Sequence, residues 1–359
     1  MDKVAKEVLG LIESHGYEAY LVGGYPRDYL LNNVTEDFDI CTSAKKEVLE
    51  EIFNVVFKDN FGSIILNYKN KIFEITTYRK EISYDGVRTP KIVYTSNLSE
   101  DIKRRDFTIN TICLNSKGEV IDLLGGLDDL KRKIIKCVGE PNKKMSEDPL
   151  RILRAIRFAC IYNFKIDKDL EHAIKNNNYL VQGLSNFRKK QELDKIFDSE
   201  NVLIGIELLR KYDICKYLDI TIPNIVITSR LGIWAQIDYS KNYIFNNFEL
   251  QLIRRIRDML NKKTISNYDL YMNDYEIVKI VSNILQIDNN CIEDMYNKLA
   301  IKTRSDIDIT YKDIIENTKI KVSIIYKELE KKILDGSIEN NRRNIVEYIR
   351  KVTINDIDK

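Results

Sequence analysis

The chain of 359 residues is longer than one ordinary domain, so two or more modules are expected. Its hydrophobic fraction of 44% predicts a folded protein, and its net charge of +2 means that any site for a polyanion must come from local clusters of Lys and Arg. Short apolar runs exclude a membrane-spanning helix, six scattered cysteines predict reduced thiols in a cytoplasmic protein, and the presence of only two histidines excludes His-rich hydrolase chemistry.

The first 140 residues or so predict a mixture of helices and strands. Residues 3–14 place apolar side chains at helical spacing, and Gly16 ends that helix. A strand over 19–22 follows, then a helix over 26–31 with proline at its first position, and then a strand over 38–41. Further strands are predicted over 63–68, 72–78 and 92–94, with Asn70 in a hairpin turn.

Helix signals dominate from Ser146 onward. SEDPLRILRAIRFACIY, residues 146–162, predicts one helix that Ser146 caps and that carries an apolar stripe. Residues 165–359 give amphipathic stretches separated by polar turns, without a repeat. We therefore expect a small α/β head followed by a long helical body.

Asp37-Phe38-Asp39 lies at the mouth of the strand predicted over 38–41. Strand alternation places the two carboxylates on one face and Phe38 with Ile40 on the other. Two carboxylates on a common face can hold a divalent cation, and hard oxygen ligands suit Mg²⁺, which takes its other ligands from water and substrate phosphates. Taken alone, the D-x-D pattern has the alternative of two solvated acids at a strand end.

The preceding Gly23-Gly24-x-x-Arg27 favours the metal site. Glycines allow backbone N–H groups to approach a phosphate chain, the helix that follows directs its positive end there, and Arg27 adds a cation. The turn is therefore predicted to hold a triphosphate, and Asp37 and Asp39 are predicted to hold the metal bound to it.

Two later segments are rich in charge. RRDFTINTI, residues 104–112, predicts a salt-bridged entry into an alternating strand. Asp148 and Arg151 are three residues apart on the predicted helix, so we expect them to be neighbours. Residues 131–157 hold nine Lys or Arg and three acidic residues, which predicts either a solvated face or a site for polyphosphate or an RNA backbone.

Taken together, ordered segments resemble the class II tRNA nucleotidyltransferases, which comprise the CCA-adding enzymes and related bacterial poly(A) polymerases. The segments are LVGGYPRDYLLNNVTEDFDICT, FGSIILNYKNKIFEITTYRKE, YDGVRTPKIVY, RRDFTINTI, LLGGLDDL and EDPLRILRAIRFA. The resemblance implies a polymerase-β-type nucleotidyltransferase head, an α/β fold with a mixed sheet, over residues 1–140. It also implies a helical neck with a base-reading helix over 141–200 and an all-α, RNA-binding body and tail over 201–359.

The family pattern implies a role for each matching residue. Asp37 and Asp39 would be catalytic and bind Mg²⁺, and Gly24 with Arg27 would contact the triphosphate. The other implied nucleotide contacts are Arg105 at the ribose, Asp148 and Arg151 at the base, and Arg154 and Arg157.

A carboxylate beside a guanidinium has a chemical reason at a base-reading site. Cytosine and adenine both present an exocyclic amine next to a ring-nitrogen acceptor, whereas uracil and guanine present the reverse. If Asp148 accepts from the amine and Arg151 donates to the ring nitrogen, the pair selects C and A. The protein would then replace a nucleic-acid template.

The resemblance implies template-independent addition of CCA to the 3′ end of tRNA, with CTP and ATP as substrates and Mg²⁺ as cofactor. In family members that complete CCA, a flexible loop precedes the RRDFT motif, and Asp85 and Arg88 within residues 82–91 match it. An ordinary hairpin connection is the alternative reading of that loop. A poly(A) polymerase, a CC-adding specialist and an A-adding specialist are the alternative activities.

Overall fold

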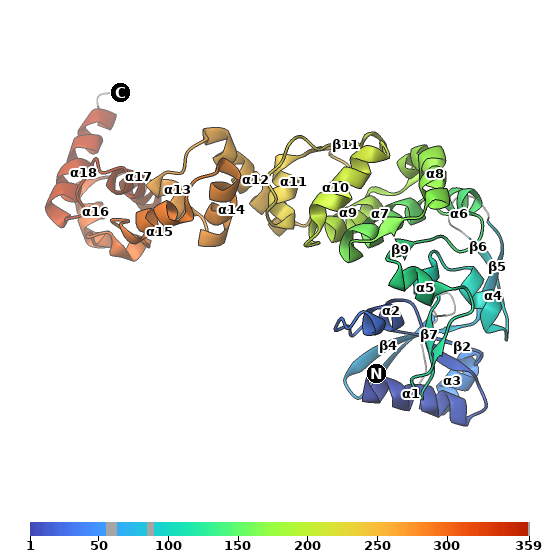
Figure 1. Ribbon diagram of the computed structural model, residues 1–359. Coiled ribbons are helices and arrows are strands. Elements are labelled where there is room, and N and C mark those ends of the chain that lie inside the picture. The colour runs from blue at the N-terminus through green and yellow to red at the C-terminus, as the bar shows by residue number, and fades with distance from the viewer. Residues whose placement is uncertain (55–62, 85–89, 358–359) are drawn as a thin grey trace. The chain divides into compact units, whose positions relative to one another are not determined.

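The structure, a computed structural model, describes residues 1–54, 63–84 and 90–357, and the chain forms two compact units (Figure 1). The first unit comprises Met1–Ile220 and Ser240–Ile244, and the second comprises Thr221–Tyr239 and Phe245–Lys359. Within the described ranges, no helix combines the length and the apolar character needed to cross a membrane.

A mixed sheet of six strands forms the base of the first unit. In spatial order its strands are β3 (Ser63–Tyr68), β4 (Lys71–Thr77), β2 (Phe38–Thr42), β1 (Ala19–Leu21), β7 (Cys113–Leu114) and β8 (Val120–Ile121). Strands β2 and β4 pair in parallel, and the other neighbouring pairs are antiparallel. The predicted mixed sheet is confirmed.

The two faces of this sheet differ in what covers them. Helices α1 (Lys3–Ser14) and α3 (Lys46–Phe53) lie on one face, where their apolar side chains pack against Ile40 and Phe73 (Figure 1). Cys41 lies on the opposite face and packs with Leu98 and Ile102 of α4 (Leu98–Lys103). Because strand side chains alternate, Asp39 shares the α4 face with Cys41.

The rest of the first unit is mainly helical. Its remaining elements are α2 (Gly24–Leu30), β5 (Arg79–Tyr84), β6 (Pro90–Tyr94), the 3-10 helix η1 (Thr108–Asn110), α5 (Gly126–Lys131), β9 (Ile134–Ile135), α6 (Pro141–Glu147), α7 (Leu150–Tyr162), β10 (Lys165–Ile166), α8 (Lys168–Asn177), η2 (Asn178–Gly183), α9 (Asn186–Phe197), α10 (Val202–Lys211) and η3 (Cys215–Leu218). Helix α7 packs against α9 and α10, so it is central to this helical part.

The second unit is built from helices around its own core, which includes Trp234, Ile253 and Val278. Its helices are α11 (Arg230–Gln236), α12 (Asn247–Lys262), α13 (Asn267–Met272), α14 (Tyr275–Leu285), α15 (Asn289–Asn297), η4 (Arg304–Asp306), α16 (Tyr311–Asn317), α17 (Val322–Leu334) and α18 (Arg342–Ile357). Two short strands, β11 (Ile220–Thr221) and β12 (Asp238–Tyr239), lie at the sequence boundaries of the units. A helical body after an α/β head is confirmed.

Two predicted helix starts were wrong. Helix α2 begins at Gly24 instead of residue 26, and Pro26 is tolerated at its third position because the first N–H groups of a helix have no partner within it. The predicted helix over 146–162 is two helices, α6 and α7, separated at Asp148, whose backbone is extended (φ −140°, ψ 93°). Pro149 explains the break, since a residue before proline is disfavoured in the α conformation.

The strand predicted within residues 104–112 is also wrong, because the segment forms the 3-10 helix η1. The carboxylate of Asp106 accepts hydrogen bonds from the Phe107 N–H (2.8 Å) and from Asn110 Nδ2 (3.0 Å), which stabilises a turn there. Phe107, Ile109 and Ile112 are nevertheless fully buried. These apolar side chains are therefore buried, as a strand would bury them, but the backbone that carries them forms a 3-10 turn.

Candidate active site

A glycine turn joins β1 to α2 and faces both aspartates of the D-x-D segment. Gly23 has φ +77°, a conformation that favours glycine, and a Cβ atom placed on it would lie 3.2 Å from Asp39 Oδ2. A Cβ atom on Gly24 would lie 3.3 Å from Asp37 Oδ2. The two glycines therefore allow close approach of the turn to both carboxylates.

Asp39 lies beside two other carboxylates. It follows Asp37 by two residues, and the parallel pairing of β2 with β4 sets it opposite Glu74. Burial, followed by the charges of Asp37 and Glu74, raises the pKa of Asp39 to about 6, although Arg105 and Arg154 oppose the rise. This excess of negative charge suits a divalent cation.

Asp37 and Asp39 could hold such a cation with their carboxylate oxygens, which are hard ligands. In residues 1–54, 63–84 and 90–357, no cluster of three or more His, Cys, Asp or Glu has the geometry of a closed metal site. An ion held by these two aspartates would therefore need further ligands from water or substrate, as Mg²⁺ commonly does.

Arg105 reaches the same turn from the segment after α4. Its Nη1 atom would lie 3.9 Å from a Cβ on Gly23, and its Nη2 atom donates to Asp101 Oδ2 at 3.2 Å. Asp101 is fully buried and also accepts from Arg104 Nε at 2.9 Å and from the Arg79 N–H at 3.2 Å. Asp101 therefore holds Arg105 near Asp39.

Arg154 connects α7 to the segment before η1. Its Nε and Nη2 atoms both lie 2.6 Å from Asp106 Oδ2. Burial alone would raise the pKa of Asp106, but Arg154, Asn110 and the Phe107 N–H together lower it to about 2. Asp106 is therefore ionised, and it fixes the orientation of Arg154.

Arg27 is buried and lies between α2 and α7. Its guanidinium pairs with Asp28 at 3.0 Å, donates to Asn110 Oδ1 and stacks over Tyr162, with Cζ 4.6 Å from the ring centre. Tyr162 in turn donates to Asp28 Oδ1 at 2.8 Å. The guanidinium group thus has protein partners on several sides, only 7% of its side chain being exposed.

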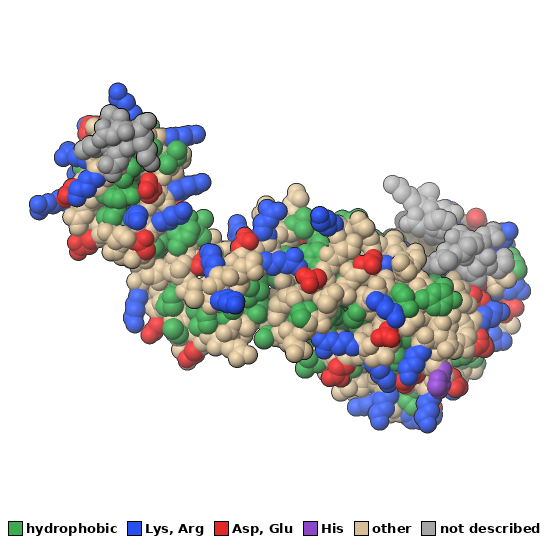
Figure 2. Space-filling model, turned by 90° about the horizontal axis from the view of Figure 1, so that it is seen from above, with side chains coloured by type: hydrophobic (Ala, Val, Ile, Leu, Met, Phe, Trp, Pro, Cys, Tyr) green, Lys and Arg blue, Asp and Glu red, His purple; other side chains and the backbone are tan. Residues whose placement is uncertain are grey.

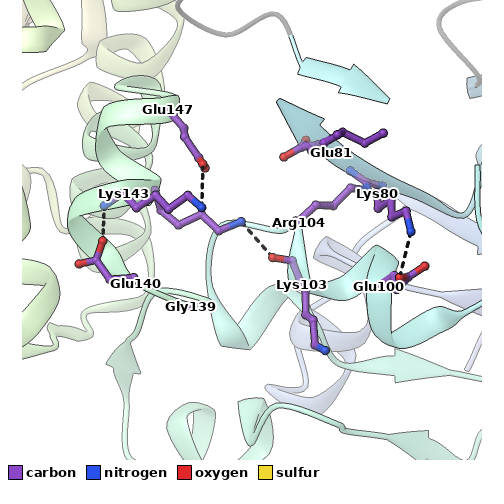
Figure 3. Close-up of a pocket in the computed structure, with 11 residues that line it drawn as sticks. Lys80, Glu81, Glu100, Lys103, Arg104, Gly139, Glu140, Lys143 and Glu147 are labelled. Atoms are coloured by element: carbon purple, nitrogen blue, oxygen red, sulfur yellow. Dashed lines mark hydrogen bonds and ion pairs between the residues drawn. The ribbon is translucent and has the colours of Figure 1, made fainter. Parts of the chain in front are cut away.

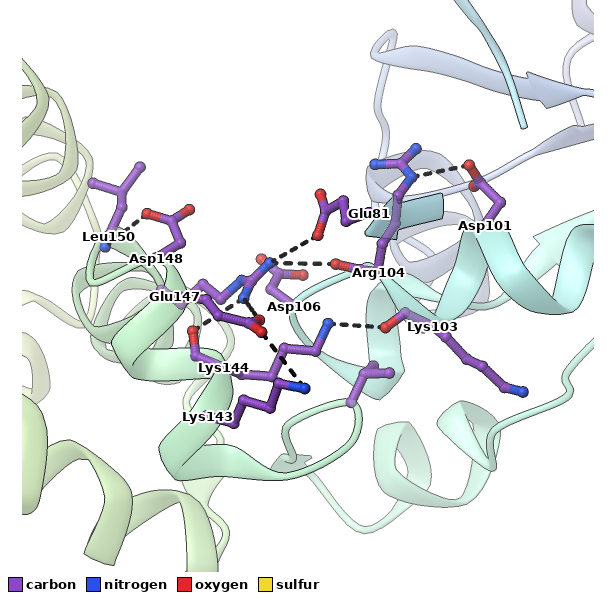
Figure 4. Close-up of polar contacts among 12 residues, drawn as sticks. Glu81, Asp101, Lys103, Arg104, Asp106, Lys143, Lys144, Glu147, Asp148 and Leu150 are labelled. Carbon is purple, nitrogen blue, oxygen red and sulfur yellow. Dashed lines mark hydrogen bonds and ion pairs between the residues drawn. The ribbon is translucent and has the colours of Figure 1, made fainter. Parts of the chain in front are cut away.

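Arg151 contacts α6 and β5, and Figure 4 labels Lys144 and Glu81, which are among its neighbours. Its Nη1 donates to the Lys144 carbonyl at 3.0 Å, and its Nη2 donates to the Arg104 carbonyl at 3.4 Å. Glu81 of β5 lies 3.9 Å from Nη2. Asp148, at the break before α7, accepts from the Leu150 N–H at 3.2 Å. The two predicted base-reading residues thus come from one turn of chain.

Lys144 and Glu81, which contact Arg151, also line a pocket of about 740 Å³ (Figure 3). Its lining alternates in charge and comes from β5, α4 and α6: Lys80, Glu81, Glu100, Lys103, Arg104, Glu140, Lys143, Lys144 and Glu147. Lys80 pairs with Glu100 at 3.4 Å, and Lys144 donates to the Lys103 carbonyl at 2.9 Å. With acids and bases neutralising one another, the pocket favours neither an anion nor a cation.

Arg157 of α7 forms an ion pair with Glu192 of α9. Its Nη1 lies 2.9 Å from Glu192 Oε2, and both side chains are almost fully buried. Burial lowers the pKa of Arg157, and Glu192 opposes that shift. The Nε atoms of Arg157 and Arg105 are buried, and neither has a hydrogen-bond partner in the described part of the chain. Each of these N–H groups can donate a hydrogen bond to an oxygen atom of a ligand.

The first unit therefore brings together Asp37, Asp39, Gly24 and Arg105 at the glycine turn, and Arg27, Arg154 and Arg157 along α7. The predicted loop residues Asp85 and Arg88 lie outside the described residues. Charge is mixed on the surface as well, since Lys and Arg are interspersed with Asp and Glu on the face seen in Figure 2.

Sequence reasoning missed four polar residues that shape this site. They are Glu74, which lies opposite Asp39, and Asp101, Asp106 and Glu192, which pair with arginines. A signal existed for Glu74, a lone acid between two apolar strand residues. Asp101, Asp106 and Glu192 lie 4, 48 and 35 positions in sequence from the arginines with which they pair. Only Asp101 and Asp106, which lie close to or within RRDFT, could have been suspected from the sequence.

Two family models match the chain. The model described as the poly A polymerase head domain matches residues 19–136. The model described as the probable RNA and SrmB-binding site of polymerase A matches residues 163–221, from the end of α7 to β11.

Curated relatives match almost the whole chain. The CCA-adding enzyme of Ligilactobacillus salivarius (strain UCC118) is 31% identical over 396 residues, which cover 98% of this chain and 96% of that protein. The CCA-adding enzyme of Streptococcus uberis is also 31% identical, with coverage of 98% and 97%.

Solved structures share the fold over its full length. The Bacillus stearothermophilus CCA-adding enzyme in complex with CTP has a TM-score of 0.84 and 26% identity, with 100% of both chains covered. The Thermotoga maritima CCA-adding enzyme complexed with tRNA has a TM-score of 0.68 and 20% identity, covering 97% of this chain and 95% of that one, and this likeness concerns the fold alone.

Proposed function

The chain belongs to the CCA-adding enzymes, and from that membership we propose that it adds C, C and A to the 3′ end of tRNA, with CTP and ATP as donors. One structural observation supports the chemistry above all others. Asp37, directly before β2, and Asp39, within β2, face a glycine turn that could not carry side chains without crowding them, and Arg105 reaches the same place. Such an arrangement fits a triphosphate with a divalent cation on it.

The reaction is a nucleotidyl transfer. The 3′-hydroxyl of the RNA attacks the α-phosphorus of the nucleotide, the bond to the β-phosphate oxygen breaks, and pyrophosphate leaves. Asp37 and Asp39 would hold Mg²⁺, which when bound supplies charge stabilisation for the attacking and leaving oxygens. The protein's own contribution is to position the reactants and to neutralise their charge.

The arginines provide the cationic part of that environment. We assign Gly24 and Arg27 to the triphosphate, Arg105 to the ribose, and Arg154 and Arg157 to further nucleotide contacts. Asp106, Asp28 and Glu192 orient the side chains of Arg154, Arg27 and Arg157, so that these cations are fixed before the nucleotide binds. Preorganised charges of this kind need no rearrangement during the reaction.

Base choice is assigned to Asp148 and Arg151. A carboxylate and a guanidinium can match the amine and the ring nitrogen shared by cytosine and adenine. Two backbone carbonyls hold Arg151, and the break before Pro149 leaves Asp148 half-buried in extended backbone ahead of α7. Because the substrate is tRNA, we place the reaction in the cytoplasm.

The decisive experiment supplies a tRNA transcript that lacks its 3′ CCA, together with Mg²⁺ and each nucleotide in turn, and sequences the product. We expect C and C from CTP, then a single A from ATP, and no addition from UTP or GTP. Asp39→Ala is the control, and it should lower incorporation by several orders of magnitude, about 10³-fold or more, because it removes a metal ligand. A long adenosine tail would instead identify a poly(A) polymerase, and a product ending in CC would identify a specialist.

A further inference from the structure

One aromatic ring contacts three of the arginines assigned to the nucleotide. The ring is that of Phe158 in α7, and the Cζ atoms of Arg27, Arg154 and Arg157 lie 5.1, 5.3 and 4.5 Å from its centre. These distances are within the range of a cation–π attraction. Phe158 is 6% exposed, so water does not weaken these contacts.

The three cations around this ring would repel one another if nothing opposed them. Each has a carboxylate partner, and the three partners are Asp28 at 3.0 Å, Asp106 at 2.6 Å and Glu192 at 2.9 Å. The cluster is therefore three ion pairs packed around one apolar ring. The carboxylates fix one end of each guanidinium, and the ring fixes its face.

The ring is also a meeting point for segments that are distant in sequence. Phe107, from the RRDFT segment, meets it edge-on with ring centres 5.7 Å apart. Tyr162, one turn further along α7, lies nearly parallel to it at 6.2 Å and also covers Arg27. Contacts from α2, from the segment before η1 and from α7 thus converge on a single side chain.

We propose that Phe158 is a positioning residue for nucleotide binding, which sets the spacing of Arg27, Arg154 and Arg157. The proposal rests on the proposed function, since it takes these arginines as contacts of the nucleotide. A rigid ring that touches all three guanidiniums fixes their distances from one another, which three separate ion pairs would not do. Without the ring, each arginine keeps its carboxylate partner but loses the contact that the three guanidinium groups share.

The test compares Phe158→Leu with Phe164→Leu. Phe164 is a matched control, because it is also 6% exposed and packs against Tyr162 at 5.7 Å, while no cation lies over its ring in the described part of the chain. Thermal unfolding of both variants, the dissociation constant for CTP with Mg²⁺, and KM and kcat for CMP addition to tRNA are measured. Phe158→Tyr, which keeps the ring, is measured beside them.

We expect Phe158→Leu to weaken CTP binding and to raise KM by about tenfold or more, with kcat changed by less than about threefold, because the arginines bind ground and transition states alike. Phe164→Leu should lose similar thermal stability and keep its affinity for CTP, and Phe158→Tyr should restore most of the affinity. A purely structural role would instead lower the active fraction, and hence kcat, without moving KM.

Unchanged CTP affinity in Phe158→Leu, or an equal loss in Phe164→Leu, overturns the proposal. If Phe158→Leu does not fold, Phe158→Met gives the same comparison with a flexible side chain of similar length. Direct binding of CTP separates this inference from the proposed function. A wild-type protein that binds CTP but does not extend tRNA contradicts the function, while the affinities of the variants still decide the role of Phe158.

Discussion

At the scale of single residues, Asp39 shows a conflict between stability and chemistry. Its carboxylate is half-buried beside Asp37 and Glu74, and desolvation together with these charges raises its pKa to about 6, so the folded protein disfavours the ionised form. The unfolded chain has no such penalty, so ionised Asp39 destabilises the metal-free fold above pH 6. Ionised Asp39 therefore lowers the stability of the fold, and its proposed role is chemical.

Replacing Asp39 by Asn should raise the free energy of unfolding at pH 7 by about 1 to 3 kcal/mol in EDTA, while nucleotide incorporation is lost. The gain should shrink as the pH falls from 7 to 4, because wild-type Asp39 then takes up a proton in the folded state first. Urea denaturation measures both effects. Mg²⁺ should stabilise the wild type more than the variant, and a variant less stable than the wild type at pH 7 would contradict this account.

Asp106 behaves in the opposite way. Its pKa in the folded protein is about 2, below the ordinary value of 3.8, so ionised Asp106 stabilises the fold at neutral pH. Asp106→Asn should lower the free energy of unfolding at pH 7 by about 2 to 3 kcal/mol, since Arg154 loses its buried partner. The exposed pair of Asp128 and Arg132 provides the control, and Asp128→Asn should cost less than about 0.5 kcal/mol.

The pH dependence gives a second measurement of the same residue. The stabilisation by Asp106 is complete above about pH 5 and is lost progressively as the pH falls from there toward 2, because the unfolded chain binds the proton first. The difference in unfolding free energy between wild type and Asp106→Asn should therefore narrow between pH 5 and pH 3. A constant difference over that range would show that the carboxylate acts through packing alone.

At the scale of elements, the break between α6 and α7 decides how Asp148 and Arg151, the residues proposed to read the base, are placed. A continuous helix would turn Asp148 into one more residue of a helix face. The extended backbone before Pro149 instead places it at the N-terminal end of α7, while Arg151 in the first turn of that helix is tied to carbonyls of α6 and of the segment after α4. The two side chains thus belong to different local structures.

Arg151→Ala should affect both selectivity and stability. If Arg151 reads the base as proposed, discrimination against UTP and GTP should fall by about tenfold or more, while the affinity for triphosphate changes little. The two carbonyls that Arg151 satisfies would lose their partner, at a cost of about 1 to 3 kcal/mol in unfolding free energy. Misincorporation assays and urea denaturation measure the two effects.

Arg132→Ala is the control for Arg151→Ala, because Arg132 is exposed and pairs at 3.4 Å with Asp128, which is exposed as well. It should leave selectivity and stability unchanged. A uniform loss of rate with all four nucleotides in Arg151→Ala would assign that residue to the phosphates instead of the base.

At the scale of the whole molecule, every described site residue belongs to the first unit. Nucleotide binding should therefore change the rate of hydrogen exchange in that unit. With saturating CTP and Mg²⁺, hydrogen exchange should slow in α7, in η1 and at the start of α2, because binding to the folded state lowers the population of opened states.

The backbone amides at the buried positions of α12 and α14, in the second unit, serve as the internal reference for this experiment. Their exchange should change by less than about twofold with CTP alone, since none of the residues that we assign to the nucleotide lies in them. Equal slowing of exchange in both units would show that CTP acts on the whole chain, and it would contradict a site confined to the first unit.

The sequence alone determined the parts of this protein that depend on local pattern. Alternation identified β2 and the common face of Asp37 and Asp39, helical spacing identified α1, and the order of motifs predicted the α/β head and helical body. Local pattern failed at η1, where buried apolar residues occur at a spacing that a strand and a 3-10 turn share, and where side-chain hydrogen bonds of Asp106 decide between them.

Only the tertiary structure decided which distant residues meet. The parallel pairing of β2 with β4 sets Glu74 opposite Asp39, and the packing of α7 brings Phe158 to Arg27, 131 positions away in the chain. Neither contact follows from spacing, because register and helix packing depend on how whole faces bury their apolar surface. The sequence therefore supplied the chemical groups, and the packing of the first unit determined how their charges are balanced around the nucleotide site.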